Sequence, residues 1–225
     1  MKGRSPILLS WSGGKDSSLA LYEIQKSRDY EVAALITTIT SDYDRVSMHG
    51  LRTILLDEQA SSSNIPLEKI FISKNASNDE YESRLKEVLL KYKQLGIRDV
   101  VFGDLFLEEI KKYREDLLGK IGMECVFPIW KRDTVKLAKR FIELGFKAIT
   151  VCVDSNVLGK EFAGREFDEH FLDDLPKAID PCGENGEFHT FVYDGPVFKN
   201  PIDHRLGETV LRDERFYYCD ILPGS

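Results

Sequence analysis

Short apolar segments alternate with longer segments of helical periodicity through the first two-thirds of the chain. Five of the short segments are almost continuously apolar and show no regular polar alternation: residues 7–9, 32–36, 70–72, 100–102 and 148–153. Strands that are covered on both faces have this pattern, because the side chains on both faces are buried. The pattern therefore predicts the strands of a mostly parallel sheet.

Helices are predicted between these strands. One apolar stripe at helical spacing ends before Gly96, and it consists of Tyr81, Leu85, Val88, Leu89 and Tyr92. Another stripe follows Asp133, which can cap a helix, and ends at Gly145. Alternating strands and helices imply an open, doubly wound α/β sheet of the Rossmann-like type. Ligands of such sheets bind beyond the carboxyl ends of the strands.

The pattern changes after about residue 153. Turn-forming residues become frequent from residue 180 onward, and three segments between the turns resemble antiparallel strands: residues 188–193, 208–211 and 215–219. We therefore expect an α/β domain over residues 1–155 and a small α+β lobe over residues 156–225. The strands near the C-terminus offer edges at which two copies could pair as a homodimer.

The segment between the first strand and its helix has the composition of an anion-binding loop. Its sequence is Ser12-Gly13-Gly14-Lys15-Asp16-Ser17. Glycines let the backbone approach a ligand, and the first N–H groups of a helix attract anions. The serines add hydroxyl donors and Lys15 adds a positive charge. Asp16 is unusual in an anion site, and we expect it to hold a Mg²⁺ ion that neutralises phosphate oxygens.

Two better-known nucleotide motifs do not describe this loop. A Walker A loop needs a glycine where this chain has Leu9, and a Ser or Thr where it has Asp16. The Gly-x-Gly-x-x-Gly fingerprint of dinucleotide-binding proteins is absent as well. A glycine turn capped by serines is the simplest alternative interpretation of the segment.

Composition narrows the possible functions. The 225 residues are 42% hydrophobic and 31% charged, as in ordinary globular proteins. No apolar run approaches the ~18 residues of a membrane span, and none resembles a signal peptide, so we expect a cytoplasmic protein without membrane contact. The net charge of −7 argues against a dedicated nucleic-acid binder. The four cysteines form no CxxC pair, which argues against a zinc ribbon or a thioredoxin-like site.

The strand, the glycine-bearing loop and the helix together resemble the pyrophosphate loop of the N-type ATP pyrophosphatases. Further segments resemble the diphthine–ammonia ligase family within that superfamily, and they extend over nearly the whole chain: residues 48–50, 102–104, 128–130, 158–159, 182–190 and 194–196. The resemblance implies a Rossmann-like fold of the adenine nucleotide α-hydrolase type. It also implies ATP and Mg²⁺ as cofactors, with residues 12–17 binding the pyrophosphate part of ATP.

The implied reaction is the amidation of a carboxylate. ATP would adenylate the acid and release pyrophosphate, and ammonia would then displace AMP. Lys15, the loop amides and Mg²⁺ would stabilise the charge that builds up on the β-phosphate. The acceptor would be a small or protein-borne carboxylate, bound by the C-terminal lobe.

Further site residues are expected at the carboxyl ends of the second and fourth strands. The resemblance places His49 and Gly50 near the nucleotide, although that turn could equally cap a helix. Gly103 and Asp104 end a buried strand at the ligand edge, where Asp104 would act in catalysis or cap the next helix.

A polar cluster late in the chain is expected to serve the acceptor. Glu187 and His189 flank Phe188, so their side chains share one face of a strand. Together with Glu184 they would orient the acceptor or take a proton from ammonia. A polar strand face with a satisfied histidine and a Glu/His metal site are the alternatives.

The late cluster departs from the family pattern, which is Glu-Gly-Gly-Glu, an aromatic residue and Glu. Asn185 stands at the first Gly position and His189 at the last Glu position. Members with this Asn/His signature resemble a bacterial branch, for which an acid other than diphthine, such as a corrinoid-pathway intermediate, is the rival acceptor. A tRNA-modifying thiolase and a non-catalytic adenine-nucleotide sensor would share the same loop.

Overall fold

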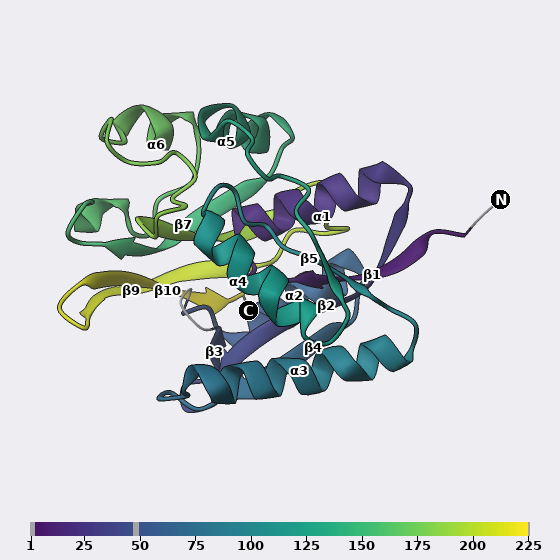
Figure 1. The fold of residues 1–225 in the computed structure, drawn as a ribbon. Helices are drawn as coiled ribbons and strands as arrows, with labels where there is room; N and C mark the ends of the chain where they lie inside the picture. The colour runs from purple at the N-terminus through teal and green to yellow at the C-terminus, as the bar shows by residue number, and fades with distance from the viewer. Residues whose placement is uncertain (1–2, 47–49, 225) are drawn as a thin grey trace.

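The computed structural model describes residues 3–46 and 50–224. A mostly parallel sheet forms its first layer (Figure 1) and contains β1 (Ser5–Ser10), β2 (Tyr30–Thr40), β3 (Arg45–Val46), β4 (Leu67–Ile72), β5 (Asp99–Val101) and β6 (Glu124–Val126). The parallel strands run in the order β4-β2-β1-β5-β6, and the short β3 pairs antiparallel with the end of β2. The predicted doubly wound α/β sheet is confirmed.

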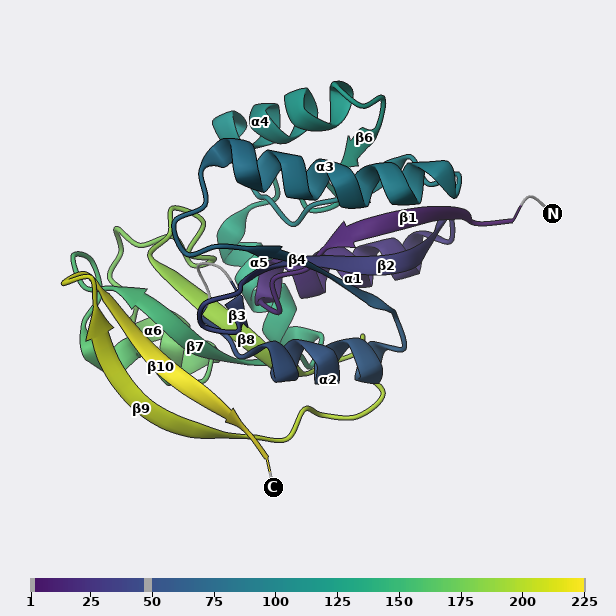
Figure 2. The ribbon, with the colours of Figure 1, turned by 90° about the horizontal axis from the view of Figure 1, so that it is seen from below.

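Helices cover both faces of this sheet (Figure 2), namely α1 (Lys15–Ser27), α2 (Thr53–Ser63), α3 (Asn78–Gln94) and α4 (Glu108–Gly119). Strand β1 shows why its sequence is continuously apolar. Ile7 and Leu9 are buried in the core on the side of α1 and α2. Leu8 is buried in the core on the side of α3 and α4. Both faces of the strand are therefore dry, as the pattern predicted.

The second sheet is antiparallel and has the order β8-β7-β10-β9. It contains β7 (Lys147–Asp154), β8 (Phe188–Asp194), β9 (His204–Arg212) and β10 (Phe216–Pro223), and it is accompanied by α5 (Thr134–Glu143), the 3-10 helix η1 (Lys160–Phe162) and α6 (Glu169–Asp174). The predicted cap is confirmed, because the Lys136 N–H donates to Asp133 Oδ1 at 2.8 Å.

One predicted strand belongs to a different sheet from the one expected. Residues 148–153 do form a strand, but β7 pairs antiparallel with β8 and β10 and does not join the parallel sheet. Seven of its eight residues are buried. An apolar run reports burial on both faces and not strand direction, so a central antiparallel strand has the same signature.

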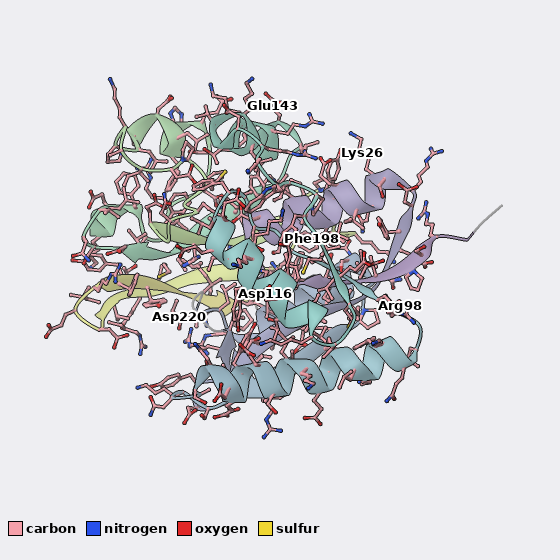
Figure 3. All side chains as sticks on the ribbon, in the orientation of Figure 1. Lys26, Arg98, Asp116, Glu143, Phe198 and Asp220 are labelled. Carbon is pink, nitrogen blue, oxygen red and sulfur yellow. The ribbon has the colours of Figure 1, made fainter. Side chains whose placement is uncertain are left out.

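The two sheets share one hydrophobic core. Leu9 and Leu35 of the first sheet belong to the same buried cluster as Phe188 and Phe191 of the second. The sheets are also joined by an ion-pair cluster around Asp220 of β10, labelled in Figure 3. Its carboxylate lies 2.9 Å from Arg45 Nη1 and 2.6 Å from Arg52 Nη2. The boundary near residue 155 stays a prediction. Among the described residues, no helix has the length and hydrophobicity to cross a membrane.

Candidate active site

The loop from Ser12 to Ser17 joins β1 to α1 at the carboxyl end of β1. Gly13 has a φ of +79°, and a Cβ there would lie 2.7 Å from Leu56 Cδ2 and 2.9 Å from Gln59 Oε1. A side chain at this position would strain the backbone and would displace Leu56 and Gln59. Gly14 is the N-cap of α1 and provides no side-chain hydrogen bond to the N–H groups of the first turn.

The loop serines shape the backbone around them. Ser12 Oγ accepts a hydrogen bond from the Gly14 N–H at 3.2 Å and lies 3.2 Å from Ser17 Oγ. The hydroxyls of Ser17 and Ser18 both donate to the Gly14 carbonyl, at 2.9 and 3.0 Å. These bonds stabilise the turn at the start of α1.

Lys15 is a buried cation at the helix start. Its side chain is only 3% exposed, and Nζ lies 2.8 and 3.0 Å from the two carboxylate oxygens of Asp16. Nζ also lies 5.5 Å from the centroid of the Phe188 ring. Burial by itself lowers the pKa of Lys15, but the adjacent Asp16 carboxylate holds it above its ordinary value, so the ammonium stays charged. Burial and the neighbouring carboxylates of Asp180 and Asp104 raise the pKa of Asp16, while Lys15 opposes them.

Two residues that the sequence analysis missed hold the loop from outside. Gln59 of α2 is fully buried; its Nε2 donates to the Gly13 carbonyl at 3.0 Å and to the Val192 carbonyl at 2.6 Å. Its Oε1 accepts from Trp11 Nε1 at 2.9 Å. Thr190 of β8 accepts the Lys15 N–H at 3.0 Å through Oγ1. Nothing in the sequence marked Gln59, because its burial is decided by the fold. Thr190 lay in the family-like segment 182–190 but had no role assigned.

The end of β5 lies directly against the loop. A Cβ on Gly103 would lie 2.8 Å from the carbonyl carbon of Asp16, so glycine is needed there for close backbone approach. The next residue, Asp104, is largely buried and forms an ion pair with Arg114 of α4, with 2.7 Å between Oδ2 and Nε. The structure thus brings Gly103 and Asp104 beside Lys15 and Asp16.

Glu184 connects the late cluster to the first sheet. Its Oε1 accepts the N–H of Leu105 at 2.8 Å and that of Phe106 at 3.4 Å. Burial raises the pKa of Glu184 to about 7, against the lowering effect of the Leu105 N–H and with help from the negative charge of Asp16. A carboxyl group that titrates near neutrality therefore lies next to the loop.

Glu187 is directed toward its own turn. Its carboxylate accepts the N–H groups of Asp180 at 3.2 Å and Asn185 at 2.9 Å. It also accepts the side-chain amide of Asn185 at 2.9 Å. The residue that departs from the family pattern at position 185 thus braces this buried glutamate.

His189 is a neutral member of the late cluster. Burial, aided by the positive charge of Lys15, lowers the pKa of His189 to about 4, so its imidazole is neutral near pH 7. Its position on β8 is opposite Cys152 of β7. Lys15 is close enough for its charge to act on this imidazole, and the expected role of His189 toward the acceptor stays a prediction.

Of the two second-strand candidates, His49 and Gly50, the structure describes Gly50. His49 lies outside the described residues. Gly50 has a φ of +67°, and a Cβ there would lie 2.9 Å from the Tyr218 ring. Its N–H donates to the Val46 carbonyl and its carbonyl accepts from Arg45, so its contacts are with β3 and β10.

Two protein-family models together match most of the chain. The diphthamide synthase N-terminal domain model matches residues 4–125, and the diphthamide synthase C-terminal domain model matches residues 133–221. A diphthine–ammonia ligase of Danio rerio is 26% identical over 226 residues, covering 90% of this chain and 88% of the relative. One of Mus musculus is 23% identical, covering 89% and 83%. One of Schizosaccharomyces pombe is 28% identical and covers 85% of this chain, which spans only 34% of that relative.

Proposed function

Because the chain belongs to the diphthamide synthase (diphthine–ammonia ligase) family, we propose that it is a ligase that uses ATP to amidate a carboxylate. The carboxylate oxygen attacks the α-phosphorus of ATP, and the bond to the pyrophosphate group breaks. Ammonia then attacks the acyl carbon of the adenylate, and AMP leaves. The observation that carries this proposal is the buried, charged Lys15 at the glycine-bearing start of α1, with Glu184 beside it.

The loop is the proposed site of the β- and γ-phosphates. An α-helix leaves its first N–H groups without helical partners. The Lys15 N–H is already bonded to Thr190, so the amides of Asp16 and Ser17 are the ones offered to an anion. The Lys15 ammonium adds a positive charge that neutralises the pyrophosphate as it departs. The ion pair between Lys15 and Asp16 would have to open for the ammonium to contact the phosphates.

Magnesium fits the residues around Asp16. Mg²⁺ is often bound by one or two carboxylates together with substrate phosphates and waters. Asp16 is 29% exposed, and the acidic Asp104 and Asp180 act on it. No group of three or more His, Cys, Asp or Glu residues in the described part of the chain is arranged to hold a metal by itself. Asp16 is therefore the residue that would hold Mg²⁺, which when bound would neutralise phosphate charge.

Glu184 is proposed as the base of the second step. Ammonia must lose a proton as its nitrogen bonds to the acyl carbon, and a carboxylate with a pKa of about 7 accepts it near neutral pH. Glu187 is proposed to position the turn, because its oxygens are occupied by the amides of Asp180 and Asn185. His189 is neutral and contributes polarity without charge.

Diphthine is the acceptor in the names of the relatives and is our first choice. A different small carboxylic acid is the second candidate, and the side chains at positions 185 and 189 favour it, since they change the surroundings of the late cluster. Chemistry of the thiolase type has less support: Cys182 lies near Lys15, but burial raises the pKa of its thiol well above the ordinary value.

The test is product analysis. The protein is incubated with ATP, Mg²⁺, ammonium chloride and either diphthine or a panel of small carboxylic acids, and nucleotides are separated by chromatography. The proposal expects AMP, pyrophosphate and an amide in equal amounts, formed only when an acid is present. Formation of ADP and phosphate, or no acid-dependent turnover, would rule the proposal out.

A further inference from the structure

Two basic side chains of α4 rest on aromatic rings at the carboxyl ends of β5 and β6. Lys111 Nζ lies 5.5 Å from the ring centroid of Phe127 and 5.0 Å from that of Trp130. Arg114 Cζ lies 4.4 Å from the ring centroid of Phe102. The three rings form a row, with 5.8 Å between the centroids of each adjacent pair. We call these five side chains the cation–aromatic row.

The row adjoins the loop that is proposed to bind phosphate. Phe102 immediately precedes Gly103, whose Cα approaches the backbone of Asp16. Asp104, the next residue, forms the ion pair with Arg114. Strand β5 is the direct neighbour of β1, and β6 is the neighbour of β5. Figure 3 shows α4, which carries the labelled Asp116, running over this side of the sheet. The row is therefore at the ligand edge, displaced from the loop toward β6.

The two cations differ in how well they are paired. Arg114 has the close carboxylate of Asp104 at 2.7 Å. Lys111 is 27% exposed, and within residues 3–46 and 50–224 its ion-pair partner is Glu115, at 3.6 Å and half exposed. Aromatic faces stabilise a cation only in part, and a mostly covered ammonium gains further from an anion. Trp130 adds a half-buried indole ring to the row.

We propose that the cation–aromatic row is the binding site of the acceptor acid, with Lys111 pairing with its carboxylate and the Phe127 and Trp130 rings packing against its carbon atoms. This inference rests on the proposed ligase function and extends it by naming residues for the acceptor. It places the acceptor at the first sheet, and not in the C-terminal lobe that the sequence led us to expect. The nucleotide's phosphates are also anions, but the loop amides and Lys15 at β1 already offer them a site. The occupant of the row is therefore the carboxylic acid.

The experiment measures two affinities in Lys111→Met, which keeps an unbranched side chain on the rings and removes only the charge. Free diphthine is the acceptor probe, and α,β-methylene-ATP with Mg²⁺ is the nucleotide probe, both titrated by calorimetry. A lost charge-assisted contact should weaken diphthine binding roughly ten- to a hundredfold. The affinity for α,β-methylene-ATP should not change. Lys111→Arg should retain most of the diphthine affinity.

Lys112→Met is the matched control, because Lys112 is the exposed next residue of the same helix and the substitution removes the same charge. It should bind both probes like the wild type. Equal diphthine affinity in Lys111→Met and Lys112→Met would overturn the inference. So would a loss of α,β-methylene-ATP affinity in Lys111→Met, because the row would then belong to the nucleotide.

Product analysis separates failure of the inference from failure of the proposed function. If the wild type forms AMP with diphthine but Lys111→Met has an unchanged KM for diphthine, the inference alone is wrong. If the wild type forms no AMP with diphthine, the function as proposed for that acceptor is wrong, and the inference falls with it. A raised KM with an unchanged kcat in Lys111→Met supports both.

Discussion

The two halves of the candidate site are built in opposite ways. The loop of residues 12–17 is short, contiguous in sequence and largely bonded to itself through Ser12, Ser17 and Gly14. The late cluster of residues 180–189 makes its decisive contact far away in sequence, from Glu184 to the backbone of Leu105. The loop can be recognised from the sequence because it is a contiguous motif. The cluster becomes a site only when the second sheet packs against the first.

This difference suggests that the loop carries charge stabilisation and the late cluster carries proton transfer and positioning. Substitutions of the charged loop residues should lower the rate of the chemical step. In the late cluster, substitution of Glu184 should lower the rate of the chemical step. Substitution of the other residues should mainly lower the stability of the turn. Four substitutions test whether these two roles are separate.

Lys15→Ala should have the largest effect. It removes a buried cation whose charge faces the departing pyrophosphate, so kcat for acid-dependent AMP formation should fall roughly a thousandfold. His170→Ala, at an exposed position of α6, should leave kcat near that of the wild type. Steady-state kinetics of both variants give the answer. A Lys15→Ala variant with more than a tenth of wild-type kcat would place the main electrostatic term elsewhere.

Glu184→Gln should lower kcat roughly a hundredfold, because the base is lost while an oxygen remains to accept the Leu105 N–H. The pH profile is the sharper measurement. The pKa of Glu184 is raised to about 7, so the wild-type kcat should fall as the pH drops through about 7, where protonation removes the base. The variant should lack this acidic limb. An unchanged limb in Glu184→Gln would assign the titration to another group.

Gln59→Leu tests whether the loop is as self-sufficient as its internal bonds suggest. The substitution leaves Trp11 Nε1 without its acceptor and removes one donor from each of the carbonyls of Gly13 and Val192. The Gly13 carbonyl keeps the Val192 N–H at 2.9 Å. The free energy of unfolding should fall by about 2 kcal/mol, a factor of about 30 in the folding equilibrium. Urea denaturation measures it, with Ser61→Ala in the same helix as control. If both variants are equally stable, the loop needs no support from α2.

Asn185→Gly should have the smallest effect. It removes the side-chain bond to Glu187 Oε1 and restores the family's glycine. The free energy of unfolding should fall by about 1 kcal/mol, and kcat/KM should fall no more than about fivefold, since the backbone N–H of residue 185 still binds Glu187. Denaturation and kinetics on the same preparation check both values. A loss as large as that of Glu184→Gln would mean that Glu187 acts in the chemistry itself.

The sequence by itself determined the parallel sheet, the loop and the family, because these depend on short-range patterns. Buried strands appear in the sequence as apolar runs, and the loop appears as glycines next to a lysine. The Asp133 cap depends on a hydrogen bond between residues three positions apart. The sequence did not reveal β6, because Glu124–Val126 are exposed or half-buried and form no continuous apolar run. It also did not reveal the direction of β7, because burial is the same for parallel and antiparallel central strands.

Tertiary structure alone decided which residues meet. The contacts of Gln59 with Val192 and of Lys15 with Thr190 join residues 133 and 175 positions apart, and no local pattern encodes such pairs. The raised pKa of Glu184 and the lowered pKa of His189 likewise arise from burial when the two sheets share a core. The sequence identifies the titratable groups, but the burial and neighbouring charges that set their pKa values exist only in the folded protein.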